Sequence, residues 1–199
     1  MSSTGTVASL VAHEPEPRVS LHPDDLSRLK LKSGDLAKVS SRWGELHVTV
    51  SADASLQRGL AFLRMHWGGA ELKHCAVRVE PAQLPWRLVA FGPADFDVLT
   101  PLMQAAPFVS RTLIGRDRRG VLLRMAASEP IENVKAIDDV FGLDEGYAVR
   151  YEDVQRASGR RISMVGGAIS AARLSGDTRS EAWLKDMWER ACRSASCVG

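Results

Sequence analysis

Cysteine is scarce in this sequence, and neither a strong charge of one sign nor a long apolar run is present. Three cysteines among 199 residues, an odd number without framework spacing, favour a reducing compartment over a disulfide scaffold. The 26 basic and 24 acidic residues nearly cancel, so the charge gives no basis for nucleic-acid binding. No apolar run approaches the roughly 20 residues of a membrane helix, and the N-terminus lacks the basic flank and apolar core of an export signal. We therefore expect a cytoplasmic protein without membrane contact.

Motifs for autonomous catalysis are also missing. The sequence contains no phosphate-binding P-loop, no dinucleotide-binding G-x-G-x-x-G, no H-E-x-x-H and no G-x-S-x-G. Three pairs of adjacent carboxylates occur, but neighbouring side chains point apart, so we interpret them as solvated surface. These pairs are Asp138-Asp139, Asp144-Glu145 and Glu152-Asp153. The sequence predicts no active site that this chain could form alone.

The stretch Pro15–Val50 has the clearest organisation. Arg18–Leu21 is predicted to be a strand, and Pro23 suits the first turn of a short helix because its missing N–H would be unpaired there. Leu36–Ser40 and Leu46–Val50 each alternate apolar with polar residues, which is the period of a half-buried strand. The stretch therefore predicts a compact, mainly β unit.

Two domains are expected. Leu60–Met65 and Cys75–Val79 are predicted to complete the strands of a first domain that covers residues 1–80. Glu80–Pro85 contains two prolines, which resist both helices and sheet ladders, and is interpreted as a linker. A second domain is expected over residues 84–199.

The pattern of the second domain predicts a small α/β sandwich. Its strands are expected at Trp86–Phe91, Val109–Ile114, Gly120–Met125, Tyr147–Asp153, Arg160–Val165 and Ile169–Leu174. Helices are expected at Asp95–Ala106, Ile131–Phe141 and Thr178–Arg190. In the last helix, Thr178 and Glu181 form a possible capping box. Its predicted buried face consists of Trp183, Leu184, Met187, Trp188 and Ala191.

Several short motifs, in series, resemble the C-terminal domain of molybdopterin-dinucleotide oxidoreductases, and above all bacterial assimilatory nitrate reductases. They cover roughly the first eighty residues. The motifs are Met1–Thr6, His13–Pro17, Val19–Asp25, Ser33–Asp35, Ser40–Gly44, Met65–Gly68 and Glu71–Val79. A fainter likeness of Ser175–Asp177 and Ala182–Leu184 to the interface domain of flavin-dependent ferredoxin and rubredoxin reductases extends into the second half. A flavin reductase itself would need a nucleotide fingerprint that this chain lacks.

The resemblance implies that residues 1–80 form a double-psi β-barrel-like domain that clamps molybdopterin guanine dinucleotide. In the family, upstream domains ligate the molybdenum and reduce nitrate to nitrite, so the partner would be those domains or a catalytic subunit, with a possible redox partner protein. We therefore expect no metal ligands in this chain and no turnover by the chain alone.

The resemblance also assigns cofactor contacts. The N-terminal loop would approach the phosphates and pterin, Met65 and His66 would shape the binding groove, and Lys73 would contact the cofactor. The loop residues concerned are Ser2, Ser3, Thr4 and Gly5. From the residues alone, the loop is better explained as a frayed terminus, and Lys73 is more simply a solvated lysine before a strand. His66 is equally well explained as a packing residue.

Departures from the family pattern support a second hypothesis, an assembly or interaction module that has lost the cofactor. Ser3 stands where relatives usually carry arginine, Arg64 stands where they carry proline, and a loop with a cofactor-binding asparagine is absent after Gly69. An iron–sulfur cluster is not supported, because Cys192 and Cys197 cannot supply the four thiolates that such clusters commonly need.

Overall fold

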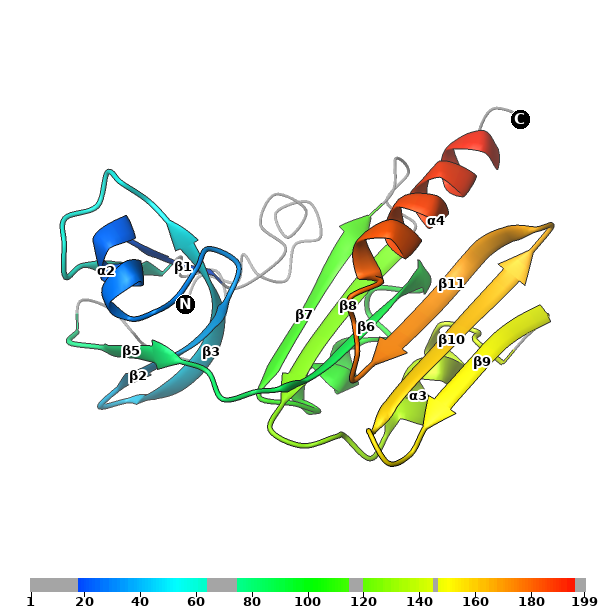
Figure 1. The fold of residues 1–199 in the computed structure, drawn as a ribbon, viewed down its shortest axis with the longest axis horizontal. Coiled ribbons are helices and arrows are strands. Elements are labelled where there is room, and N and C mark those ends of the chain that lie inside the picture. The colour runs from blue at the N-terminus through cyan, green and yellow to red at the C-terminus, as the bar shows by residue number, and fades with distance from the viewer. Residues whose placement is uncertain (1–17, 64–74, 115–119, 145–146, 196–199) are drawn as a thin grey trace. The chain divides into compact units, whose positions relative to one another are not determined.

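The computed structural model describes residues 18–63, 75–114, 120–144 and 147–195 (Figure 1). The chain folds as two compact units, Met1–Gln83 and Leu84–Gly199. Within the described residues, no helix is both long and apolar enough to cross a membrane.

The first unit is built on a five-stranded sheet. Its described elements are β1 (Arg18–Leu21), α2 (Pro23–Arg28), β2 (Leu36–Ser41), β3 (Gly44–Ala52), β4 (Ala61–Leu63) and β5 (Arg78–Pro81). The strand order is β4-β1-β3-β2-β5. Strands β1 and β3 run parallel, and the other neighbouring pairs are antiparallel.

The alternation in β2 and β3 separates an apolar face from a polar face. Val48 and Val50 of β3 are buried together with Ala37 and Val39 of β2, and Leu26 of α2 packs against this side. Each of the valine and leucine side chains contributes about 1.5–3 kcal/mol when it is fully withdrawn from water. The apolar face therefore forms the core of the first unit.

Helix α2 begins where the sequence predicts. Pro23 occupies the first turn, and the backbone N–H of Asp24 donates to Nδ1 of His22 over 3.1 Å. Asp25 is buried, and its carboxylate accepts from the backbone N–H of Gly59 (2.6 Å) and from Arg28 (3.0 Å). A charged residue of the helix thus fixes the connection between β3 and β4.

The second unit is a six-stranded sheet in which every neighbouring pair is antiparallel. Its order is β7-β8-β6-β11-β10-β9. The strands are β6 (Trp86–Pro93), β7 (Phe108–Ile114), β8 (Gly120–Ala127), β9 (Tyr147–Asp153), β10 (Ser158–Val165) and β11 (Ala168–Ser175). The helices are η2 (Thr100–Gln104), α3 (Val134–Val140) and α4 (Glu181–Ala195).

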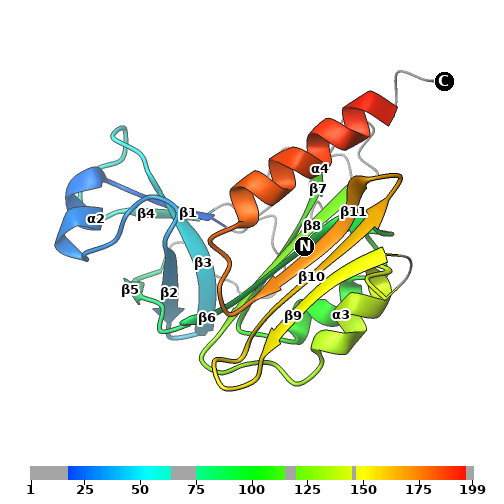
Figure 2. The same cartoon turned by 45° about the vertical axis from the view of Figure 1, so that its right-hand side comes forward.

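Helices α3 and α4 lie on opposite faces of this sheet (Figure 2). Leu88 and Ala90 of β6 pack with Ile137 of α3, whereas the alternate residues Val89 and Phe91 pack with α4. On the α4 side, Trp188 meets Phe91 edge to face at 6.0 Å, and its indole N–H donates to the carbonyl of Ser170 (2.7 Å). The period-two alternation of a central strand therefore supplies two cores.

The structure is mainly β, with few helices, as the sequence predicts for its first half. The closure of a barrel is not seen among the strands described for the first unit. The strand predicted at Cys75–Val79 instead covers Arg78–Pro81. The sandwich expected in the second half is a single sheet with one helix on each face.

Two helix predictions in the second unit were too long. The helix predicted over Asp95–Ala106 is reduced to the short 3-10 helix Thr100–Gln104. Pro101 explains this, because a proline inside an α-helix removes a hydrogen bond and collides with the preceding turn. Helix α3 begins at Val134 rather than Ile131.

The predicted buried face and cap of the last helix were partly wrong. Leu184 and Trp188 are buried, but Trp183 and Met187 remain 55% and 49% exposed because α4 contacts the sheet along a narrower stripe. The carboxylate of Glu181 accepts hydrogen bonds from Arg124 of β8 (2.7 and 2.9 Å), so it braces the helix against the sheet.

Candidate functional site

The residues predicted to contact a cofactor lie outside the described part of the chain. They are Ser2, Ser3, Thr4, Gly5, Met65, His66 and Lys73. The side chains of Cys192 and Cys197 also lie outside it. The described residues instead show where the segments that carry the seven predicted contacts join the sheet.

In the first unit, the start of β1, the end of β4 and the start of β5 lie toward the same end of the sheet. Strand β1 runs parallel to β3, so its first residue, Arg18, faces the end of the sheet at which β3 begins. Strand β4 runs antiparallel to β1, and its last residue, Leu63, lies beside Val19. The chain therefore leaves β4 toward the end of the sheet from which β1 starts. Strand β5 is antiparallel to β2, and therefore parallel to β3, so Arg78 also starts from this end.

This end of the sheet joins the segments that carry the predicted contacts. Residues 1–17 precede β1, and residues 64–74 lie between β4 and β5. The topology therefore connects all seven predicted residues to one end of one sheet, although they are separated by up to 71 positions in the sequence. We call it the β3-start end.

The turn between β2 and β3 also lies at the β3-start end. The guanidinium of Arg42 stands over the ring of Trp43, 4.5 Å from its centroid, and Trp43 is 63% exposed. The hydroxyl of Ser41 accepts from the backbone N–H of Trp43 (3.1 Å), which holds the turn. In the sequence this tryptophan is recognised only as part of a motif, and no local pattern indicates the exposed cation–π pair that it forms.

Charged residues line the polar face next to this turn. Lys38 of β2 and Glu45 of β3 form an ion pair with a 2.5 Å N–O distance. His47 is the cross-strand partner of Lys38. Burial lowers the pKa of His47, against the opposing effect of Glu45, so its imidazole is neutral at pH 7. This face offers hydrogen-bonding groups, while among the described residues no three His, Cys, Asp or Glu side chains converge to hold a metal.

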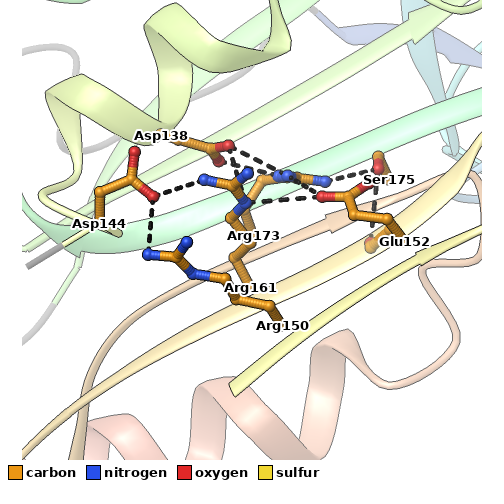
Figure 3. A network of polar contacts seen from close by, with 8 residues as sticks. Asp138, Asp144, Arg150, Glu152, Arg161, Arg173 and Ser175 are labelled. Atoms are coloured by element: carbon orange, nitrogen blue, oxygen red, sulfur yellow. Dashed lines mark hydrogen bonds and ion pairs between the residues drawn. The ribbon is translucent and has the colours of Figure 1, made fainter. Parts of the chain in front are cut away.

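The most buried polar cluster lies in the second unit (Figure 3). Arg173 of β11 is 2% exposed and donates to both oxygens of Asp138 of α3 over 2.9 and 3.0 Å. It also donates to Glu152 of β9 (2.9 Å) and to the hydroxyl of Ser175 (2.8 Å). The prediction that Asp138 is solvated surface was wrong, because Asp138 is 1% exposed and pairs with Arg173 on the face of the sheet that α3 covers.

A second arginine closes this cluster. Arg161 of β10 lies 3.3 Å from Asp138 and 2.6 Å from Asp144, and the latter carboxylate also meets Arg150 of β9 at 3.2 Å. The cluster borders a hollow of about 430 Å³. Three arginines thus face three carboxylates, so this arrangement ties α3 to β9, β10 and β11 rather than offering an unbalanced charge to a ligand.

Comparison with known proteins bears on the first unit. Residues 1–84 match the family described as Molydopterin dinucleotide binding domain. Over these residues the chain is similar to that domain, which is also the domain that the motifs of the sequence resemble. Nearly all of the second unit lies outside the match.

Two curated relatives are larger proteins. An F420-dependent formate dehydrogenase subunit alpha from Methanocaldococcus jannaschii is 33% identical over an alignment of 98 residues, which covers 39% of this chain and 15% of that protein. A nitrate reductase from Klebsiella oxytoca is 37% identical over 67 residues, which covers 34% of this chain and 8% of that protein. The chain therefore spans a small part of the relatives that it matches.

Proposed function

We propose that this chain serves a nitrate reductase-like molybdoenzyme by clamping one arm of molybdopterin guanine dinucleotide in its first unit. The observation that carries the proposal is the family match over residues 1–84. The likeness to a nitrate reductase supports the choice of reaction, the two-electron reduction of nitrate to nitrite. We interpret the likeness to a formate dehydrogenase as a sign that the two proteins bind the same kind of cofactor, and not that they act on the same substrate.

In this proposal the cofactor contacts gather at the β3-start end. Phosphate oxygens would accept hydrogen bonds from the hydroxyls of Ser2, Ser3 and Thr4 and from the backbone at Gly5. Flexible backbone N–H groups are suited to binding such anions. Lys73 would add a positive charge, while Met65 and His66 would shape the groove. The common attachment of their segments to one end of the sheet supports this grouping.

The proposal extends to the fold and to the partners. The parallel pairing of β1 with β3 between antiparallel neighbours is compatible with a double-psi β-barrel, which we propose for residues 1–80, with residues 84–199 as an appendage domain. Upstream domains or a separate subunit would hold the molybdenum and the nitrate. We also propose a cytoplasmic location, supported by the scarcity of cysteine.

Titration with molybdopterin guanine dinucleotide tests cofactor binding. Ligand at about 100 times its Kd stabilises the native state by about 2.7 kcal/mol, so the melting temperature of the first unit should rise clearly. Lys73→Ala and the double variant Ser2→Ala/Thr4→Ala should reduce the rise. Lys32→Ala is the matched control, because Lys32 is an exposed lysine of the same unit that precedes β2 at the opposite end of the sheet.

The alternative function is a non-catalytic assembly module that has lost the cofactor, favoured by Ser3, Arg64 and the short connection after Gly69. An unchanged melting temperature over the whole titration would refute cofactor binding by the first unit and support this alternative. Separately, nitrate reduction by the purified 199-residue chain with added reductant would refute the proposal that the chemistry belongs to other domains.

A further inference from the structure

Strand β9 is an edge of the second sheet. It pairs with β10 over seven residues without a register shift, and it has no second neighbour among the described strands. Exposed edges are usually blunted by proline, by charged side chains, above all lysine, or by a bulge. The sequence of β9, YAVRYED, contains neither proline nor lysine, and its pairing contains no bulge, although Arg150, Glu152 and Asp153 are charged. Its outer backbone groups therefore remain a template for another strand.

The edge also carries exposed apolar side chains on the α4 side of the sheet. Val149 and Tyr151 are 47% and 53% exposed. Val149 and Tyr151 pair with Ile162 and Arg160 of β10, and this pairing places their side chains on the α4 side of the sheet. Helix α4 itself packs on β11 and β6, farther from this edge. Together with Trp183, Val149 and Tyr151 line a hollow of about 940 Å³. Val149 and Tyr151 are thus exposed apolar side chains on this face, although charged residues such as Arg160 also line the hollow.

The opposite edge strand is different. The side chains of β7 are buried or half-buried. Arg111 of β7 donates to the carbonyl of Phe96 (2.7 Å) and to the hydroxyl of Thr100 (2.8 Å), so the segment before β7 covers it. The second unit therefore protects one edge of its sheet and leaves the other exposed.

The charges of β9 complement a second copy of β9. Arg150 and Glu152 alternate with Val149 and Tyr151 and point to the α3 side of the sheet. If two copies pair antiparallel about Tyr151, each Arg150 lies opposite the Glu152 of the other copy. Centring the pair on Arg150 or on Glu152 would instead oppose like charges, which destabilises a sheet. Centring it on Val149 would leave both charges without an opposite partner.

We infer that the protein forms a two-fold symmetric dimer through β9, with Tyr151 facing Tyr151 of the second copy. Antiparallel pairing joins the two six-stranded sheets into one continuous sheet and hydrogen-bonds both outer edges. It also brings Val149 and Tyr151 of both copies together on the α4 side. Such an interface is isologous, so each residue that it uses is used twice.

Sedimentation of the full chain over a wide concentration range tests the dimer. We expect a reversible increase to twice the monomer mass. Tyr151→Lys and Val149→Lys should each raise the dissociation constant by about tenfold or more, because a lysine on a strand edge removes apolar contact and adds repulsion. Val98→Lys is the matched control, since Val98 is 52% exposed in the same unit but lies away from β9.

Cysteine cross-linking tests the register. Residues directly opposite in an antiparallel pair have Cα atoms about 4.5–5.5 Å apart, within the range that a disulfide spans. With Cys75, Cys192 and Cys197 replaced by serine, Tyr151→Cys should form a covalent dimer under mild oxidation. Val149→Cys should not, because its opposite residue is Asp153 of the other copy.

Each result of sedimentation and cross-linking supports or overturns a stated part of the proposal. A chain that stays monomeric at every concentration overturns the dimer, and so does a dimer that Tyr151→Lys and Val149→Lys leave as strong as Val98→Lys does. A dimer that cross-links through Val149→Cys instead of Tyr151→Cys overturns the register. Circular dichroism of each variant confirms that the second unit is still folded. None of these measurements depends on cofactor binding by the first unit.

Discussion

Replacing Asp138 with asparagine should strongly destabilise the second unit. The substitution keeps the shape of the side chain but removes its charge. Arg173 is 2% exposed and directs two hydrogen bonds to this carboxylate, at 2.9 and 3.0 Å. Burial lowers the pKa of Arg173, but its hydrogen bonds and charge attraction to Asp138 and Glu152 outweigh that effect and raise the pKa above the ordinary value. Arginine is not deprotonated in proteins, so the guanidinium stays charged even when the variant removes the charge of Asp138.

The size of the effect follows from the remaining partners. Removing one member of a buried ion pair typically costs 3–5 kcal/mol, because the other charge stays buried without compensation. Glu152, still 2.9 Å from Arg173, is 48% exposed and partly compensates, so we expect a loss of about 3 kcal/mol. For a unit of roughly this size, about 4 °C of melting temperature corresponds to each kcal/mol, which predicts a decrease of about 12 °C.

Differential scanning calorimetry of the full chain measures this decrease, and tryptophan fluorescence gives a second readout, since three of the five tryptophans, Trp86, Trp183 and Trp188, lie in the second unit. Arg179→Gln is the matched control. It removes an arginine with equally short contacts to Asp177 (2.9 and 3.0 Å), but Arg179 is 90% exposed, so its melting temperature should not change measurably. A decrease for Asp138→Asn no larger than for Arg179→Gln would refute the stabilising role of the buried pair.

Two further predictions concern packing and pH. A Cβ added at Gly120 would lie 2.0 Å from the ring of Trp188, so Gly120→Ala should lower the free energy of unfolding by about 1–3 kcal/mol. In a Trp188→Leu background the same substitution should cost less, and denaturant unfolding measures both values. An undiminished cost in that background would contradict the contact. Burial lowers the pKa of His47 below its ordinary 6.5, so the unfolded chain binds more protons at acid pH, and the first unit should lose stability as the pH falls below about 6.5. His47→Gln should remove this dependence in urea unfolding followed through Trp43, and a slope that persists would assign it to other groups.

The strands could be predicted because their cause is local. In β3, Leu46, Val48 and Val50 alternate with polar residues, and one face of the sheet is buried, so the period appears directly in the sequence. The turn at Gly166 and Gly167 also has a local cause. Both residues have positive φ, at 59° and 80°, which glycine adopts without strain and which a tight hairpin requires.

The buried charges could not be predicted in this way. The neighbouring carboxylates of Asp138 and Asp139 do point apart, and for that reason one of them enters the core while the other stays exposed. The partner of Asp138 is Arg173, 35 positions farther along the chain and on another element. Only the pairing of β9, β10 and β11 brings these charges together, so no spacing within the sequence indicates the contact.

The candidate cofactor site combines both situations. Its residues are predicted from sequence motifs, whereas the attachment of their segments to the β3-start end follows from sheet topology. The parallel pairing of β1 with β3 is decisive here, because an antiparallel pairing would send Arg18 to the opposite end of the sheet. No local pattern distinguishes these two directions.

The ion-pair cluster also bears on the proposed dimer, because Glu152 belongs to both. Its Oε1 oxygen accepts from Arg173 at 2.9 Å, which holds the side chain of an otherwise exposed edge strand in one position opposite the Arg150 of a second copy. Asp138→Asn disturbs the position of Arg173, so we expect it to weaken the dimer as well as the fold. Val149→Lys lies on the other face of the sheet and should weaken the dimer alone. If Asp138→Asn lowers the melting temperature but leaves the dissociation constant of the dimer unchanged, the cluster stabilises the monomer without ordering the edge, and the charge complementarity of β9 does not depend on it.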